Sequence, residues 1–313
     1  MVTPILTVSD KALTAADINC WLAEENISAD KVIVSNELVN NLFTARSMTV
    51  KITAKSTASG RTKELYYKSI KGLDVREEER AALRRDLLSN RNEANLYKYF
   101  GEDLRAMGVS IPKCYHVDCV GNIDDGDESV LASSGFSILI DCVDSNDYFQ
   151  RSPLTASEAR LSVELLADLH AASLGNLPLL KKAKKHLFAR GGYWEMGKRG
   201  YALPNLTVNW ANFRSAFADF DDECWLDTPE AAAMGERLER AALILCEKLV
   251  VDVDTPGACI IHGDAKAMNM FLPNNDEKGE NGLLIDFQVR CAVLCVADAD
   301  NVRHTTDTRL THD

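Results

Sequence analysis

The hydrophobic pattern of the first 140 residues is mostly that of β-strands. From Ser47 onward, Met48, Val50 and Ile52 alternate with polar residues. This period of two turns one face of a strand toward a core and the other toward solvent. Further runs rich in Val, Ile, Leu and aromatic residues predict strands at 29–40, 65–70, 114–120 and 130–140. The polar stretch 56–61 predicts a hairpin turn.

Helical patterns appear near the N-terminus and dominate after residue 140. Apolar residues at helical spacing predict a short helix within 14–24. Residues 75–100 are dense in Glu, Arg, Ala and Leu and lack Gly and Pro, so they predict the longest early helix, with Ser89-Asn90 as the place where it would break. Gly108 and Pro112 would stop it. Further helices are predicted at 155–173, 206–220 and 229–250.

The change from strand spacing to helical spacing places a boundary near residues 140–146. The chain has 313 residues, more than one compact core usually holds. We therefore expect two lobes or two domains. The first, residues 1–140, is strand-rich with one main helix, and the second, residues 141–313, is mainly helical.

Composition and charge narrow the class of protein. Hydrophobic residues make up 46% and charged residues 26%, which excludes a disordered or fibrous chain. The formal net charge of −12 repels phosphate backbones and anionic lipid, so neither nucleic acid nor a membrane is an expected partner. No leader pattern or membrane-spanning apolar run is present, so we expect a cytoplasmic protein. The nine cysteines show no paired Cys-x-x-Cys spacing and are expected to be reduced packing residues.

One segment in the C-terminal third has a pattern unlike ordinary core sequence. An apolar run ends in His262-Gly263-Asp264, and Asn269 follows five residues after the aspartate. Asp286 stands twenty-two residues after Asp264, at the end of another apolar run. The polar stretch 273–282 predicts a hairpin turn between the two runs, which would bring Asn269 close to Asp286.

These three residue types are the ones that phosphoryl transfer requires. The reaction needs a carboxylate that accepts or orients the proton of a hydroxyl, and hard oxygen ligands that place Mg²⁺ on the phosphates. Asp264, Asn269 and Asp286 supply such groups. Each alone would more often be an ordinary turn or capping residue. Their order and spacing together favour the chemistry.

The motifs resemble those of the aminoglycoside and choline phosphotransferase superfamily, whose fold is protein-kinase-like. His262-Gly263-Asp264 with Asn269 looks like its catalytic loop, and Ile285-Asp286-Phe287-Gln288 looks like its metal loop. The nearest variety is the ecdysteroid kinase-like group of small-molecule kinases. The resemblance implies an α+β fold of two lobes, an antiparallel-sheet N-lobe at residues 1–140 that binds the nucleotide and a mainly helical C-lobe at 141–313.

The resemblance implies that ATP and Mg²⁺ are used to phosphorylate a hydroxyl of a small molecule. Sterol, choline-like amine and aminoglycoside acceptors all remain open. Asp264 would be the catalytic proton acceptor, and Asn269 and Asp286 would hold the metal and thus the nucleotide. Lys68, on the predicted third strand, would bind the phosphates, and Glu93 on the main helix would orient it.

Other residues take supporting roles by the same resemblance. Backbone groups around Ile140 and Cys142 would contact the adenine edge. His170, in the segment Leu166-Ala167-Asp168-Leu169-His170-Ala171, is expected to be a hydrogen-bonded structural histidine rather than a base. His262 is expected to brace the catalytic loop.

Two segments depart from the family's pattern. Residues 39–47, which would cover the phosphates, contain no Gly, so Asn40, Asn41 and Ser47 would have to take over that role. After Gln288 the usual Gly-containing segment and further helices do not follow, which predicts a truncated C-lobe. An inactive pseudokinase, binding a nucleotide or a partner, is therefore the alternative function. A protein kinase is disfavoured, because Asp-Phe-Gln replaces Asp-Phe-Gly and no Ala-Pro-Glu segment follows.

Overall fold

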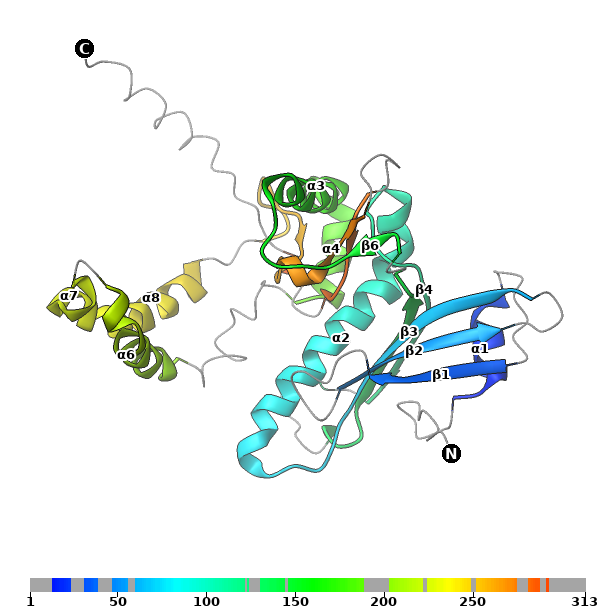
Figure 1. Ribbon diagram of the computed structural model, residues 1–313, viewed down its shortest axis with the longest axis horizontal. Coiled ribbons are helices and arrows are strands. Elements are labelled where there is room, and N and C mark those ends of the chain that lie inside the picture. Colours follow the sequence, from blue (N-terminus) through cyan, green and yellow to red (C-terminus); the bar gives the residue numbers. More distant parts are fainter. Residues whose placement is uncertain are drawn as a thin grey trace, which may run out of the picture.

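The structure is a computed structural model, and it describes residues 13–23, 31–38, 47–55, 60–121, 123, 130–143, 146–188, 203–221, 224–248, 252–274, 281–287 and 291–292. These residues form an α+β protein in which a long helix lies between an antiparallel sheet and a group of helices and short strands (Figure 1). In the described part of the chain, no helix is both long and apolar enough to cross a membrane.

The main sheet has five antiparallel strands in the order β1-β2-β3-β5-β4. Their bounds are Lys31–Leu38 for β1, Ser47–Lys55 for β2, Thr62–Lys71 for β3, Cys114–Val120 for β4 and Gly135–Asp141 for β5. All five strands predicted from the sequence are confirmed. The central strand β3 places Lys68 between Thr49 on β2 and Ile138 on β5. The predicted turn at 56–61 lies largely outside the described residues.

Strand β5 of the main sheet begins later in the sequence than the apolar pattern at 130–140 predicts. Residues 130–134 form a turn instead, because the hydroxyl of Ser134 donates to the carbonyl of Val130 at 2.7 Å. The carbonyl of Ser134 in turn accepts from the amide of Gly72 at 2.7 Å, just after β3. A Cβ at Gly72 would come within 1.7 Å of the carbonyl oxygen of Leu131, so this close approach requires a glycine.

The main helix, α2, spans Glu77–Ala106 without interruption. The break predicted at Ser89-Asn90 is wrong, because both side chains are buried within the helix and the Asn90 amide donates to the carbonyl of Asp86 one turn earlier. The helix ends before Gly108, whose φ of 89° suits a glycine. Packing therefore outweighs the weak helix propensity of Ser and Asn.

The two faces of the sheet are covered by different helices. Helix α2 packs against β3, β4 and β5 on one face (Figure 1). On the other face lies α1, Ala15–Trp21, the predicted N-terminal helix. Thr14 and Asp17 form a capping box at its start, and Ile18 is buried against strand residues such as Ile52 and Leu65.

The remaining elements near the sheet are helices of medium length and short strands. Helix α3 spans Ala156–Ser173 as predicted and begins at the N-cap Thr155. Helix α4, Leu177–His186, was not predicted. Its sequence is rich in lysine, and its few apolar residues form too short a pattern to indicate a helix. The short elements are β6 Tyr148–Phe149, β7 Ile260–Ile261, η7 Ala267–Asn269, β8 Met270–Pro273, β9 Leu283–Leu284 and β10 Cys291–Ala292.

A further group of helices, α6, α7 and α8, lies together on one side of the molecule (Figure 1). The predicted helix 206–220 is α6, Asn205–Phe217, followed by the 3₁₀ turn η5, Ala218–Phe220. The predicted helix 229–250 is two helices, α7 Pro229–Ala232 and α8 Met234–Lys248. A Cβ at Gly235 would lie 2.8 Å from the Cα of Thr207, so this glycine permits the close packing of α8 on α6.

One continuous core connects the sheet with the short strands that carry the motifs. It includes Ile70 and Phe136 of the sheet, Leu169 of α3, and Leu284 and Phe287 after the predicted turn at 273–282. The pairing of Met270 with Leu284 confirms that β8 and β9 form the predicted hairpin. The division into lobes at residue 140 stays a prediction, as does the truncated C-lobe.

Candidate active site

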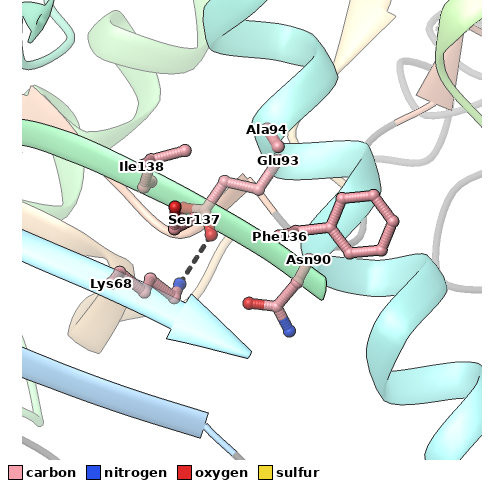
Figure 2. Close-up of a pocket in the computed structure, with 7 residues that line it drawn as sticks. All are labelled: Lys68, Asn90, Glu93, Ala94, Phe136, Ser137 and Ile138. Atoms are coloured by element: carbon pink, nitrogen blue, oxygen red, sulfur yellow. Dashed lines mark ion pairs between the residues drawn. The ribbon is translucent and has the colours of Figure 1, made fainter. Parts of the chain in front are cut away.

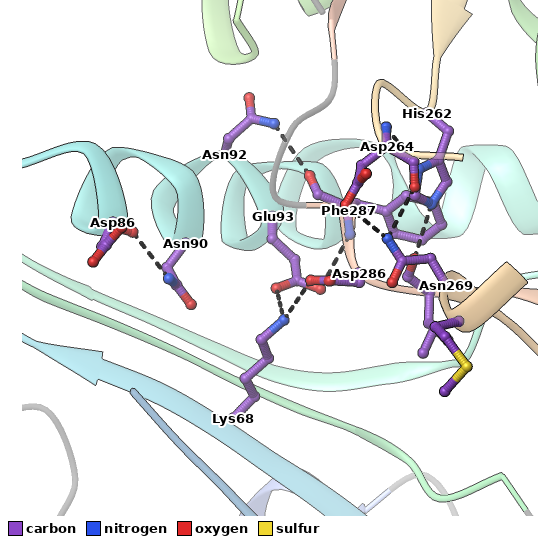
Figure 3. Close-up of polar contacts among 12 residues, drawn as sticks. Lys68, Asp86, Asn90, Asn92, Glu93, His262, Asp264, Asn269, Asp286 and Phe287 are labelled. Carbon is purple, nitrogen blue, oxygen red and sulfur yellow. Dashed lines mark hydrogen bonds and ion pairs between the residues drawn. The ribbon is translucent and has the colours of Figure 1, made fainter. Parts of the chain in front are cut away.

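Three charged side chains from distant parts of the sequence meet at one point (Figure 3). The Nζ atom of Lys68, on β3, lies 2.7 Å from Oε2 of Glu93 on α2 and 2.9 Å from Oδ1 of Asp286 in the loop after β9. The side chain of Glu93 is 4% exposed, that of Lys68 18% and that of Asp286 29%. The structure thus brings together three residues that the sequence assigned to one site.

Burial and the neighbouring opposite charges shift the pKa values of these three residues in opposite directions. Burial lowers the pKa of Lys68, but the carboxylates of Glu93 and Asp286 outweigh it and hold the pKa above its ordinary value. Burial raises the pKa of Glu93, although Lys68 and the Phe287 amide oppose the shift. At Asp286 burial also raises the pKa, but Lys68, with further contributions from Lys266 and His262, more than reverses this, so the pKa lies below its usual range. Lys68 is therefore protonated and Asp286 ionised at neutral pH.

The backbone turns sharply at Asp286. Its φ is 62°, in the left-handed region, which Asp tolerates better than most residues with a side chain. Just before the turn, the Ile285 amide donates to the Asn269 carbonyl at 3.0 Å. Just after it, the Phe287 amide donates to Oε1 of Glu93 at 3.3 Å, and the Phe287 side chain is fully buried. The turn therefore aims the Asp286 carboxylate at Lys68 while Phe287 anchors the loop in the core.

Helix α2 contributes a second contact to the same loop through Asn92, which is 2% exposed. Its Nδ2 atom donates to the Phe287 carbonyl at 3.2 Å. Its Oδ1 atom accepts from the amide of Phe188, after α4, at 2.9 Å. Asn92 thereby joins α2 to two other segments. It was not predicted as a site residue, although it directly precedes Glu93 in the sequence.

The loop between β7 and β8 begins with His262, which is 1% exposed. Its Nδ1 atom accepts from the Asp264 amide at 3.4 Å, which leaves Nε2 to donate to the Ile285 carbonyl at 2.8 Å. His262 thus joins the two motif loops, in agreement with its expected bracing role. His170 lies half-buried on α3, where burial lowers its pKa. In the described part of the chain, no hydrogen bond reaches its ring, contrary to expectation.

Asp264 and Asn269 lie in contact within this loop (Figure 3). The Nδ2 atom of Asn269 donates to the Asp264 carbonyl at 2.9 Å and to Oδ2 of its carboxylate at 3.1 Å. Lys266 places its Nζ atom 2.8 Å from the same Oδ2. Asn269 is 3% exposed, whereas the Asp264 side chain is 38% exposed. The aspartate is thus held in place and still open to a reactant.

The oxygen donors of this site suit Mg²⁺. Asn269 uses Nδ2 on Asp264, which leaves its amide oxygen for a metal, and Asp286 adds a carboxylate that the Asn269 backbone holds close by. No group of three or more His, Cys, Asp or Glu side chains could hold a metal ion among the described residues. Mg²⁺ commonly binds through one or two carboxylates together with substrate phosphates, so the pair of residues fits that ion.

A narrow recess lies beside Lys68 and Glu93 (Figure 2). Residues of β3, α2 and β5 line it, among them Asn90 and Phe136, and its interior leaves no space for a water molecule. Of the described residues of the two motif loops, none lines this recess.

The predicted adenine contacts are restricted by the structure. Ile140 is paired within the sheet, and the amides of Asp141 and Cys142 donate to the carbonyls of Lys113 and Glu64 at 2.9 and 3.2 Å. Those two N–H groups are thus already used, and adenine recognition by this segment stays a prediction. Ser47 begins β2, and its side chain lies outside the described residues, as do Asn40 and Asn41.

A comparison with protein families shows which family the chain matches. The model of the ecdysteroid kinase-like family matches residues 42–295. This range covers more than half of the 313 residues and includes Lys68, Glu93 and both motif loops. No curated protein sequence matches the chain.

Proposed function

Because the chain belongs to the ecdysteroid kinase-like family, we propose that it transfers the terminal phosphate of ATP to a hydroxyl of a small molecule, with Mg²⁺ as the metal. One observation carries this proposal. The ammonium of Lys68 contacts the carboxylates of Glu93 and Asp286 at distances of 2.9 Å or less. The backbone of Asn269 bonds to the residue before Asp286, and its side chain donates to the partly exposed carboxylate of Asp264. A kinase-like enzyme needs a cation for phosphate, hard ligands for a metal and a proton acceptor, all in one place.

The surroundings of each residue indicate its role in the proposed reaction. Lys68 would bind phosphate oxygens of ATP, because Glu93 holds its ammonium at the site. Asp286 and Asn269 would hold Mg²⁺, which when bound neutralises phosphate charge and orients the terminal phosphate. Since Asp286 now pairs with Lys68, a bound cation would have to share this carboxylate with the lysine.

The contacts of Asp264 favour Oδ1 as the oxygen that would act as the base. Oδ2 already accepts from Asn269 and Lys266, whereas no hydrogen bond reaches Oδ1 from the described part of the chain. The acceptor hydroxyl would therefore donate to Oδ1. As its oxygen bonds to the terminal phosphorus, the bond from that phosphorus to ADP breaks and the hydroxyl proton passes to Asp264.

A turnover assay tests this proposal even while the acceptor is unidentified. ADP formation from ATP and Mg²⁺ is measured against a library of small alcohols that includes sterols, amino alcohols and aminoglycosides. We expect turnover with at least one acceptor and a loss of about 10²- to 10⁴-fold in Asp264→Asn, the range for a general base. Turnover that survives Asp264→Asn would contradict the assigned base. Binding of MgATP without turnover across the library would support the inactive nucleotide-binding alternative.

A further inference from the structure

The loop that carries Asp286 is held by two neighbouring side chains of α2. The amide of Phe287, the next residue, donates to Oε1 of Glu93 at 3.3 Å, and its carbonyl accepts from Nδ2 of Asn92 at 3.2 Å. Asn92, Glu93 and Phe287 are all buried, so water competes little for these bonds. Both backbone polar groups of the residue after Asp286 are therefore bound to one helix (Figure 3).

The backbone at Asp286 needs this support. Its φ of 62° lies in the left-handed region, which is unfavourable for a residue with a Cβ and persists where surrounding contacts hold it. On the side before the turn, the Ile285 amide donates to the Asn269 carbonyl at 3.0 Å. On the side after the turn, the contacts of Phe287 with α2 hold the backbone. The direction of the Asp286 carboxylate therefore depends on both sides of the turn.

Asn92 holds this loop from outside the proposed phosphate site, since its side chain points away from Lys68 in Figure 3. Its Oδ1 atom accepts from the Phe188 amide at 2.9 Å, which fixes the orientation of the side-chain amide and leaves Nδ2 to donate to the Phe287 carbonyl. Glu93, by contrast, also binds the Lys68 ammonium at 2.7 Å, so a change at Glu93 would disturb phosphate binding directly. A change at Asn92 reaches the site through the backbone of the metal loop.

We propose that Asn92 is a positioning residue: its hydrogen bond to the Phe287 carbonyl keeps the Asp286 carboxylate in the orientation that would bind Mg²⁺. The inference rests on the proposed function and extends its metal site to a residue that would touch neither ATP nor the ion. Without this bond the Phe287 carbonyl could turn, the left-handed backbone at Asp286 could relax, and the carboxylate would lose its preset direction. Lys68 and Glu93 would keep their ion pair, so phosphate binding would persist.

The test measures ATP affinity by calorimetry, with and without Mg²⁺, for the wild-type chain and Asn92→Ala. We expect the gain in ATP affinity that Mg²⁺ gives to fall by about five- to tenfold in Asn92→Ala, the loss that one hydrogen bond explains. The ATP affinity without Mg²⁺ should stay within about twofold of the wild-type value, because Lys68 is unchanged. A merely structural role would lower both affinities alike. That result, or an undiminished gain from Mg²⁺, would overturn the inference.

Asn95→Ala is the matched control, because the Asn95 side chain donates from the same helix to a backbone carbonyl outside the site, that of His186, at 2.7 Å. This variant should keep the full gain from Mg²⁺. An equal loss of the gain in Asn95→Ala would also overturn the inference, since any lost contact of α2 would then have the same effect.

A second measurement needs no variant and decides the question if Asn92→Ala does not fold. By thermodynamic linkage, Mg²⁺ must strengthen the Asn92 bond as much as that bond strengthens Mg²⁺ binding. Hydrogen exchange of the Asn92 side-chain amide, followed by NMR in the wild type, should therefore slow by about five- to tenfold when Mg²⁺ is added to the ATP complex. Unchanged exchange would overturn the inference. A wild type that bound no ATP, or gained nothing from Mg²⁺, would overturn the proposed function on which the inference rests.

Discussion

Lys68 shows how one residue serves both the fold and the proposed chemistry. Its ammonium compensates Glu93, which is almost fully buried on α2, and Asp286, which sits at a left-handed turn. The resemblance of the motifs to those of a known family predicted this set, which residue types and spacing alone had narrowed only to Asp264, Asn269 and Asp286. Contacts such as those of Lys266 depend on side-chain geometry within the loop, which spacing alone does not give.

At this scale we predict that Lys68→Met lowers the free energy of unfolding by about 3–5 kcal/mol, because it leaves the Glu93 carboxylate buried without its cation. Chemical denaturation measures this change. Lys51, whose pair with Glu64 is 33% and 47% exposed, provides the control. Lys51→Met should cost less than about 1 kcal/mol. Similar losses in the two variants would show that the Lys68 pairs contribute no more than surface pairs.

At the scale of elements, α2 holds the site together, since it carries Glu93 for β3 and Asn92 for the loop after β9. Strands with alternating or apolar runs were predicted well, as were helices with long uninterrupted patterns. The errors lie where side-chain contacts decide the local structure. The hydroxyl of Ser134 forms a turn, so β5 begins later than predicted. Helix α2 continues through Ser89 and Asn90 because both side chains are buried. Helix α4 buries only a few apolar side chains.

For this element we predict that Asn92→Ala costs about 2–5 kcal/mol in the free energy of unfolding. The substitution leaves two buried backbone groups, the Phe188 amide and the Phe287 carbonyl, without their partner, at about 1–3 kcal/mol each. Asn95→Ala is the matched control, because the Asn95 side chain donates from the same helix to one backbone group, the His186 carbonyl, at 2.7 Å. It should cost about half as much or less. A smaller loss in Asn92→Ala than in Asn95→Ala would contradict the role given to Asn92.

At the scale of the whole molecule, a chain with a net charge of −12 is proposed to bind the anion ATP. Local charge resolves this conflict, because Lys68 and Lys266 flank the carboxylates and a divalent cation would add to them. The continuous core makes the arrangement possible, since Ile70 of β3 and Phe287 of the metal loop belong to the same apolar cluster. No spacing along the sequence could have shown that core, because it joins residues that are far apart in the chain.

The most direct measurement of the central claim is a calorimetric titration of ATP into the wild-type chain, with and without Mg²⁺, and into Asp286→Asn. The account predicts that Mg²⁺ tightens ATP binding at least about tenfold in the wild type, since Asp286 and Asn269 would hold the ion on the phosphates. Asp286→Asn should lose that gain. Equal ATP affinity with and without Mg²⁺ in the wild type, or an undiminished gain in Asp286→Asn, would contradict the claim that these side chains form one nucleotide–metal site.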